Sequence, residues 1–118
     1  MSKKNILVCG GRNFTDQCMV DSVLDWSSIR GDIRIINGGA KGADACATRY
    51  AKENNHLYKE YKADWAVNGR AAGPLRNREM LREEDISLVI AFPGGKGTAD
   101  MIRQARAKGI EVLEIRYE

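Results

Sequence analysis

Two segments of the chain carry almost the same glycine-rich sequence, and each follows a run of β-branched and apolar residues. Residues 36–44 read Ile-Asn-Gly-Gly-Ala-Lys-Gly-Ala-Asp, and residues 92–100 read Phe-Pro-Gly-Gly-Lys-Gly-Thr-Ala-Asp. A shorter turn, Gly10-Gly11-Arg12, follows the first apolar run. Between a strand and a helix, glycine lets the backbone approach an anion, and the helix N-terminus favours negative charge. The three turns therefore predict alternating strands and helices, with a site for a nucleotide or another phosphate-bearing ligand.

The apolar pattern predicts five strands, at residues 5–9, 33–36, 57–61, 86–92 and 112–117. Apolar residues recur at helical spacing in four further segments, which predicts four helices. The first begins at residue 15 or 16 and ends near 27, and the other three span residues 42–54, 75–84 and 98–108. We expect segment 63–74 to be irregular, the very apolar strand 86–92 to be central, and the alternating strand 112–117 to lie at an edge.

This order of elements predicts a single α/β domain over residues 1–118, with three layers and a mainly parallel sheet of about five strands. The glycine turns all follow strands, so they gather at the carboxyl edge of the sheet, where such folds bind ligands.

Composition narrows the function classes. A net charge of +3 and a pI near 8.8 suit an anionic ligand but are too weak to indicate nucleic acid. The three cysteines form no Cys-x-x-Cys pair, so we expect free thiols and a cytoplasmic protein. His56 is the only histidine, which excludes a histidine-rich metal site, and we expect no metal and no cofactor. No apolar run approaches the ~18 residues of a membrane span, so we expect no membrane partner.

Three cations lie in or beside the glycine turns. Arg12 follows a glycine pair at a strand end, and arginine can hold phosphate through two parallel hydrogen bonds. Lys41 and Lys96 are either phosphate contacts or solvated surface lysines. The Thr98 hydroxyl either caps the following helix or bonds a phosphate oxygen.

Other polar and aromatic residues have two interpretations each. Asp44 and Asp100 fall in first helical turns, where a carboxylate is favourable through the helix dipole alone or serves to bond a ribose hydroxyl or a base edge. Asp64 and Trp65 in segment 63–74 either bond and stack a base or anchor the loop on the core. Arg76 and its neighbours either contact the ligand or form a capped, charge-paired surface helix.

These segments together resemble the SLOG superfamily of Rossmann-like domains, named for the DNA-processing protein DprA and the LOG enzymes. Within it they are similar to the small YspA/cpYpsA-related domains of bacteria and phages. The resemblance rests on residues 10–12, 38–44, 63–65, 72–77, 80 and 91–101. It implies a nucleotide-type ligand over the carboxyl edge and, because LOG-like relatives pair through helices, a homodimer. With the glycine turns, it predicts ligand contacts from Gly10, Gly11, Arg12, Gly38, Gly39, Lys41, Gly42, Asp44, Asp64, Trp65, Arg76, Asn77, Gly94, Gly95, Lys96, Gly97, Thr98 and Asp100.

The enzymes of this superfamily provide a residue-by-residue comparison. LOG enzymes resemble Pro-Gly-Gly-x-Gly-Thr-x-x-Glu with a catalytic glutamate, and this chain has Met101 at that position. Asp100 is one residue earlier, and one helical step turns a side chain by about 100°. A second LOG pattern, Arg-Lys-x-x-Met, fits Arg76 and Met80 with Asn77 in place of the lysine, once a small insertion is allowed.

Three functions follow from the resemblance and the residues. The leading hypothesis is a domain that binds a nucleotide or nucleotide-derived ligand, as a sensor or a sequestering protein. The alternative is a hydrolase of the N-glycosidic bond of nucleoside monophosphates, with Asp100 stabilising an oxocarbenium-like centre and Arg76 the phosphate. The third, binding of single-stranded nucleic acid in the manner of DprA, has only weak basicity and two tryptophans in its favour.

Overall fold

The five strands pair in the order β3-β2-β1-β4-β5, and every neighbouring pair is parallel. The computed structural model describes residues 3–29 and 31–116. Its strands are β1 (Lys4–Cys9), β2 (Ile33–Asn37), β3 (Leu57–Glu60), β4 (Ile86–Ala91) and β5 (Val112–Glu114). This confirms the predicted α/β fold and its parallel sheet.

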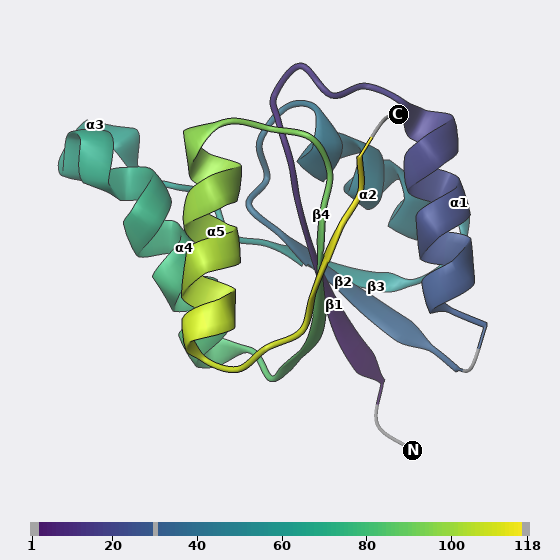
Figure 1. Cartoon of the computed structure of the whole chain (residues 1–118). Helices are drawn as coiled ribbons and strands as arrows, with labels where there is room; N and C mark the ends of the chain where they lie inside the picture. Colours follow the sequence, from purple (N-terminus) through teal and green to yellow (C-terminus); the bar gives the residue numbers. More distant parts are fainter. Residues whose placement is uncertain (1–2, 30, 117–118) are drawn as a thin grey trace.

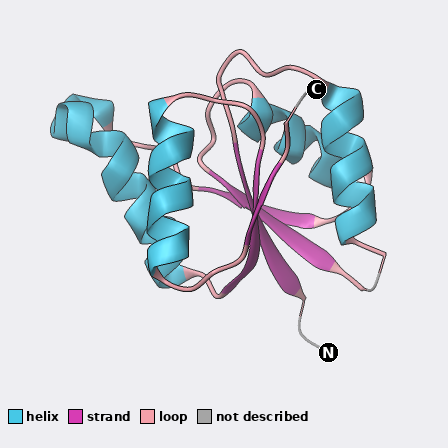
Figure 2. Cartoon of the chain, viewed as in Figure 1, coloured by secondary structure: helices cyan, strands magenta, loops and turns pink. Residues whose placement is uncertain are grey.

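Helices cover both faces of the sheet (Figures 1 and 2), and the alternation of side chains along β1 shows how. Ile6 and Val8 are buried against α1 (Gln17–Ser27) and α2 (Ala43–Glu53). Leu7 and Cys9 point to the other face and are buried against α4 (Ala72–Glu83) and α5 (Lys96–Ala107). Successive side chains of a strand point to opposite faces, so a strand buried on both faces reads as one continuous apolar run.

Segment 63–74 is helical, and the prediction of an irregular loop is wrong. It contains α3 (Trp65–Asn68), the 3-10 turn η1 (Gly69–Ala71) and the start of α4 at Ala72. The Asp64 carboxylate caps α3 by accepting a hydrogen bond from the Val67 N–H at 3.1 Å. Pro74 does not break α4, because it lies in the first turn, where a helix leaves its N–H groups unpaired.

The predicted places of two strands in the sheet are confirmed, and one of these strands is shorter than expected. β4, the most apolar run, lies inside the sheet between β1 and β5, and β1 is the middle strand. β5 is an edge strand as expected, but it ends at Glu114 rather than at 117. Glu114 pairs with Ala91, the last residue of β4, and the Ile115 N–H donates a last hydrogen bond to the Ala91 carbonyl at 2.8 Å. Tyr117, in the predicted strand, lies outside the described residues.

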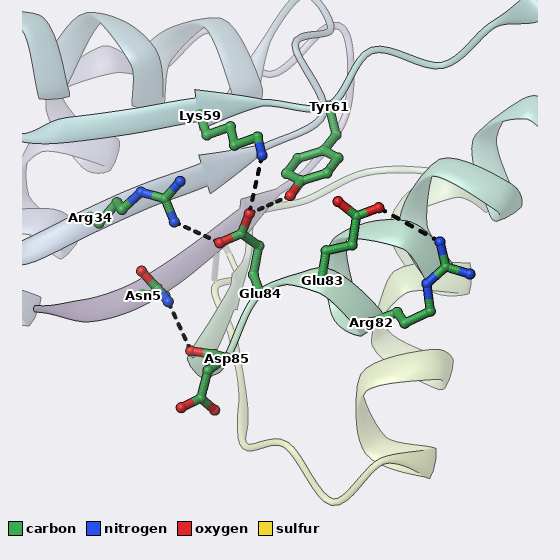
Figure 3. A network of polar contacts seen from close by, with 8 residues as sticks. All are labelled: Asn5, Arg34, Lys59, Tyr61, Arg82, Glu83, Glu84 and Asp85. Carbon is green, nitrogen blue, oxygen red and sulfur yellow. Dashed lines mark hydrogen bonds and ion pairs between the residues drawn. The ribbon is translucent and has the colours of Figure 1, made fainter. Parts of the chain in front are cut away.

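A charged network fastens the end of α4 to the sheet (Figure 3). The Glu84 carboxylate accepts hydrogen bonds from Arg34 of β2 at 2.6 Å and from the Tyr61 hydroxyl, and Lys59 Nζ of β3 lies 3.6 Å away. Burial raises the pKa of Glu84, but the hydrogen bonds from Tyr61 and Arg34 outweigh it, so the pKa lies below its usual value. The network holds α4 across the β2–β3 half of the sheet, and its N-terminal half reaches the carboxyl edge.

Candidate functional site

The loops that follow β1, β2 and β4 meet at the carboxyl edge of the sheet (Figure 1) and line a cavity of about 1000 Å³. The chain runs outward from β1 through β2 to β3 on one side, and from β4 to β5 on the other. The cavity therefore lies where the strand order reverses, which is where open α/β sheets bind ligands. Its volume is at the upper end of the range of about 300–1,000 Å³ for small-molecule sites.

Most of the predicted contact residues lie around this cavity. Those that line it are Gly10, Gly11, Arg12, Gly38, Gly39, Lys41, Asp44, Trp65, Arg76, Asn77, Gly95, Lys96, Gly97, Thr98 and Asp100. Gly42, Asp64 and Gly94 are not in its lining. Two further cations, Lys62 and Arg70, line the cavity although no motif marks them. Lys62 follows the end of β3 at the same edge of the sheet, and this position is a signal that could have identified it.

Gly42 and Gly94 hold the three turns together. The Gly11 N–H donates to the Pro93 carbonyl at 2.9 Å, and the Gly11 carbonyl accepts from the Ala43 N–H at 3.2 Å. Gly42 has a φ of +80°, and a Cβ there would lie 2.2 Å from the Gly11 carbonyl oxygen. A Cβ on Gly94 would lie 2.6 Å from the Gly11 nitrogen. These glycines are required for close packing between loops, which places their neighbours around the cavity.

Asp44 clamps the turn between β2 and α2. Its Oδ2 accepts hydrogen bonds from the N–H groups of Gly38 at 3.1 Å and Ala40 at 3.2 Å, and the residue is only 6% exposed. Burial raises its pKa to about 6, although the two N–H donors and the nearby Arg76 act in the opposite direction. The oxygen that points to the turn is therefore already engaged before any ligand arrives.

Arg76 and Asn77 of α4 connect the turn after β2 to the start of α5. Arg76 donates from Nη1 to the Gly38 carbonyl at 2.9 Å and from Nε to Asn77 Oδ1 at 2.9 Å. Asn77 Nδ2 in turn donates to Asp100 Oδ2 at 3.0 Å and to the Gly97 carbonyl at 3.3 Å. A Cβ on Gly38 would lie 2.2 Å from Arg76 Nη1, so a side chain at this position would displace the guanidinium. Burial lowers the pKa of Arg76.

Asp100 has donors on both carboxylate oxygens. Oδ2 accepts from Asn77 and from Gln104 Nε2, the latter at 2.7 Å, and Oδ1 pairs with Arg103. Asp100 is 6% exposed, so displacing these donors would leave a buried charge without compensation. Its geometry favours a role in positioning α4 against α5.

The remaining cations of the cavity have no carboxylate partner. Among the described residues, five such side chains line it: Arg12, Lys41, Lys62, Arg70 and Lys96. The two carboxylates in the lining, Asp44 and Asp100, are both hydrogen-bonded within the protein. Within the described part of the chain, the lining of the cavity therefore has an excess of positive charge, which suits an anionic ligand.

Trp65 forms part of the cavity rim and does not anchor the core. It is 50% exposed, and α3 has no buried residue. The Arg12 guanidinium carbon lies 5.6 Å from the centroid of its ring, within cation–π range. A Cβ on Gly73 would lie 3.4 Å from its Cη2 atom, so α4 passes the edge of the ring closely. The core-anchor interpretation of Trp65 is wrong, and a half-exposed aromatic surface lies beside the cations.

Cys9 is the thiol in the cavity lining, and it is not activated. Burial, followed by the charge of Asp44, raises its pKa to about 12, so it is protonated at neutral pH. Over residues 3–29 and 31–116 there is no group of three or more metal-ligating side chains. None of the helices in that part of the chain is long and apolar enough to cross a membrane.

Comparisons with known proteins agree with the resemblance. Residues 4–67 match the family described as YspA, cpYpsA-related SLOG. The chain is 32% identical to the Gene 61 protein of Mycobacterium phage D29, over 93% of this chain and 94% of that protein. The chain belongs to the YspA, cpYpsA-related SLOG family.

Solved structures share the fold at low sequence identity. Two structures of the C-terminal domain of the PF1911 hydrogenase from Pyrococcus furiosus superpose with TM-scores of 0.58 and 0.56, at 19% and 18% identity. Each alignment covers 98% of this chain and 94% of the other. At this identity the similarity concerns the fold alone.

Proposed function

We propose that this member of the SLOG family binds a nucleotide or nucleotide-derived ligand in the cavity at the carboxyl edge, as a sensor or a sequestering domain. The observation that carries the proposal is the set of five cations without carboxylate partners around a cavity of about 1000 Å³. A phosphate-bearing ligand would supply the missing negative charge.

The start of α5 supports a position for the phosphate of such a ligand. Within the described chain, no side chain caps this helix at Gly95, so its first N–H groups face the cavity without a side-chain acceptor. No side chain covers the backbone at Gly95 and Gly97, and a Cβ at either position would meet nothing within 4 Å. Lys96 lies between these two glycines in the sequence, and Arg12 lies on the loop that follows β1. One phosphate group could therefore contact both charged side chains and N–H donors.

The other end of the ligand meets an aromatic surface. Trp65 is half-exposed at the rim and lies next to Arg12. Stacking of a base on an aromatic side chain is worth about 1–3 kcal/mol, so a nucleotide fits this rim better than a sugar phosphate without a base.

The partners of the carboxylates favour binding over hydrolysis. A hydrolase of the N-glycosidic bond needs a carboxylate beside the sugar that is available to the reaction. Asp100 is held by Asn77 and Gln104, and Asp44 is held by the turn after β2. We therefore expect the ligand to be recovered unchanged after incubation with the protein.

A pair of variants tests the binding proposal. Gly95→Val puts a side chain into the cavity, where the structure leaves room for it, whereas Ala99→Val introduces the same side chain at an exposed site on α5 outside the lining. We expect calorimetric titration with AMP, ADP, NAD and ADP-ribose to show binding to the wild type and to Ala99→Val. Gly95→Val should bind at least about tenfold more weakly, the equivalent of 1.4 kcal/mol, while circular dichroism shows it to be folded at the temperature of the titration.

Two results would contradict this proposal. Equal affinity in Gly95→Val and the wild type would show that the ligand does not occupy the cavity beside α5. Release of free base, detected by chromatography of the incubated ligand, would replace binding with hydrolysis.

A further inference from the structure

A second cavity adjoins the first one. It has a volume of about 550 Å³ and lies between α2 and the end of β3. Both cavities are lined by Gly39, Ala40 and Lys62, so the turn after β2 is the boundary between them. A ligand that crosses this turn would pass from the first cavity into the second without leaving the protein surface.

Gly39, at this crossing point, lacks a side chain for a structural reason. Gly39 has a φ of +67°, and a Cβ there would lie 3.0 Å from Cγ of Lys62. The absence of a side chain lets the stem of Lys62 lie against the turn, and Lys62 is therefore placed where both cavities begin.

The second cavity has a small excess of positive charge, because three cations and two carboxylates line it. Arg49 is paired with Glu53 at 2.9 Å, and Glu60 accepts a hydrogen bond at 2.8 Å from the Thr48 hydroxyl, which carries no charge. Lys52, also in the lining, has no carboxylate partner among the described residues; its Nζ lies 5.7 Å from the centroid of the Tyr58 ring. With Lys62 at the boundary, a second anionic group would find a cation at each end of this cavity.

The size of the two cavities exceeds what one nucleotide needs. The first alone reaches about 1000 Å³, the upper end for small-molecule sites. Asp44 lies in the first cavity and Lys52 in the second, eight residues further along α2, which at about 1.5 Å per residue is roughly 12 Å along the helix axis.

We propose that the ligand is a linear dinucleotide, which extends over the turn at Gly39 and places its second phosphate-linked unit in the second cavity against Lys52 and Lys62. This rests on the proposed function, because the first unit is held in the first cavity. Arg49 takes no part in the recognition, since its guanidinium already pairs with Glu53.

The test compares the affinities of mononucleotides and dinucleotides for the protein at constant salt concentration. The probes are AMP, GMP, CMP and UMP and the corresponding 5′-phosphorylated dinucleotides pApA, pGpG, pCpC and pUpU. We expect at least one dinucleotide to bind about tenfold more tightly than its mononucleotide, equivalent to about 1.4 kcal/mol, because its second phosphate gains charged hydrogen-bond donors. Lys52→Gln should remove this gain and leave the mononucleotide affinity unchanged.

Lys4→Gln is the matched control, because Lys4 is an exposed lysine at the amino end of β1, away from both cavities. It should retain the gain. If mononucleotides bind and no dinucleotide binds more tightly, the second-cavity proposal is overturned while the proposed function stands. A gain that survives Lys52→Gln, or one that Lys4→Gln also removes, overturns it too. If neither mononucleotides nor dinucleotides bind, the dinucleotide proposal is overturned, and the proposed function is decided by the titrations with NAD and ADP-ribose.

Discussion

Protonation of Asp44 should make the protein more stable in mild acid. The pKa of this carboxyl is raised from 3.8 to about 6 by burial, a difference of about two pH units. At about 1.36 kcal/mol per unit, the ionised form destabilises the fold by roughly 3 kcal/mol relative to the protonated form. The sign follows from linkage, because the pKa is higher in the folded state than in the unfolded state. The stabilising contribution of the protonated Asp44 carboxyl is therefore fully present below pH 3.8 and is lost as the pH rises through 6.

The comparison that isolates this effect uses Asp44→Asn. The amide keeps an oxygen that accepts from Gly38 and Ala40, but it does not titrate. Denaturant unfolding between pH 7 and pH 4.5 should show the free energy of unfolding of the wild type rising by about 2 kcal/mol relative to Asp44→Asn. The same exchange at Asp64, an exposed helix cap where asparagine is an equally good cap, reports the effect of removing a surface charge.

Parallel pH profiles for the wild type and Asp44→Asn would refute the reasoning. They would mean that water or movement of the turn solvates the carboxylate, so that burial does not determine its pKa. A slope of the opposite sign would mean that the N–H donors of the turn outweigh burial.

Other consequences of the structure can be tested in the same way. Glu84→Ala should lower the free energy of unfolding by about 2 to 3 kcal/mol, because it leaves Arg34 without its partner, and a Tm unchanged in calorimetry would contradict this. Gly42→Ala should destabilise the fold, since its φ is +80° and a Cβ would lie 2.2 Å from a carbonyl oxygen. Gly97→Ala should raise the Tm, because the added methyl group meets open space on a helix and stabilises the fold by up to about 1 kcal/mol. Equal Tm values for Gly42→Ala and Gly97→Ala would contradict both predictions. Buried Cys9, whose pKa is about 12, should react with iodoacetamide at pH 7.5 far more slowly than exposed Cys18, as peptide mass spectrometry can measure.

The sequence by itself determined the fold and the edge of the sheet at which the larger cavity lies. Continuous apolar runs, helical periodicity and glycines after strands are local properties, and parallel pairing puts everything that follows a strand at one edge. The positions of Arg12, Lys96 and Gly95 around one cavity follow from this logic. The helical structure of segment 63–74 could not be predicted in this way, because glycine and proline usually mark a loop. Here Gly69 lies in a 3-10 turn and Pro74 in the first turn of α4.

Only the tertiary structure decided what each polar group does at that edge. Arg76 binds the Gly38 carbonyl across 38 residues of chain, and Asn77 reaches Asp100 across 23. Contacts at such separations leave no periodic trace, so the sequence could not distinguish a carboxylate engaged within the protein from one that faces a ligand. The same reason explains Lys62, whose place at the junction of two cavities depends on how β3, α2 and the turn at Gly39 pack together.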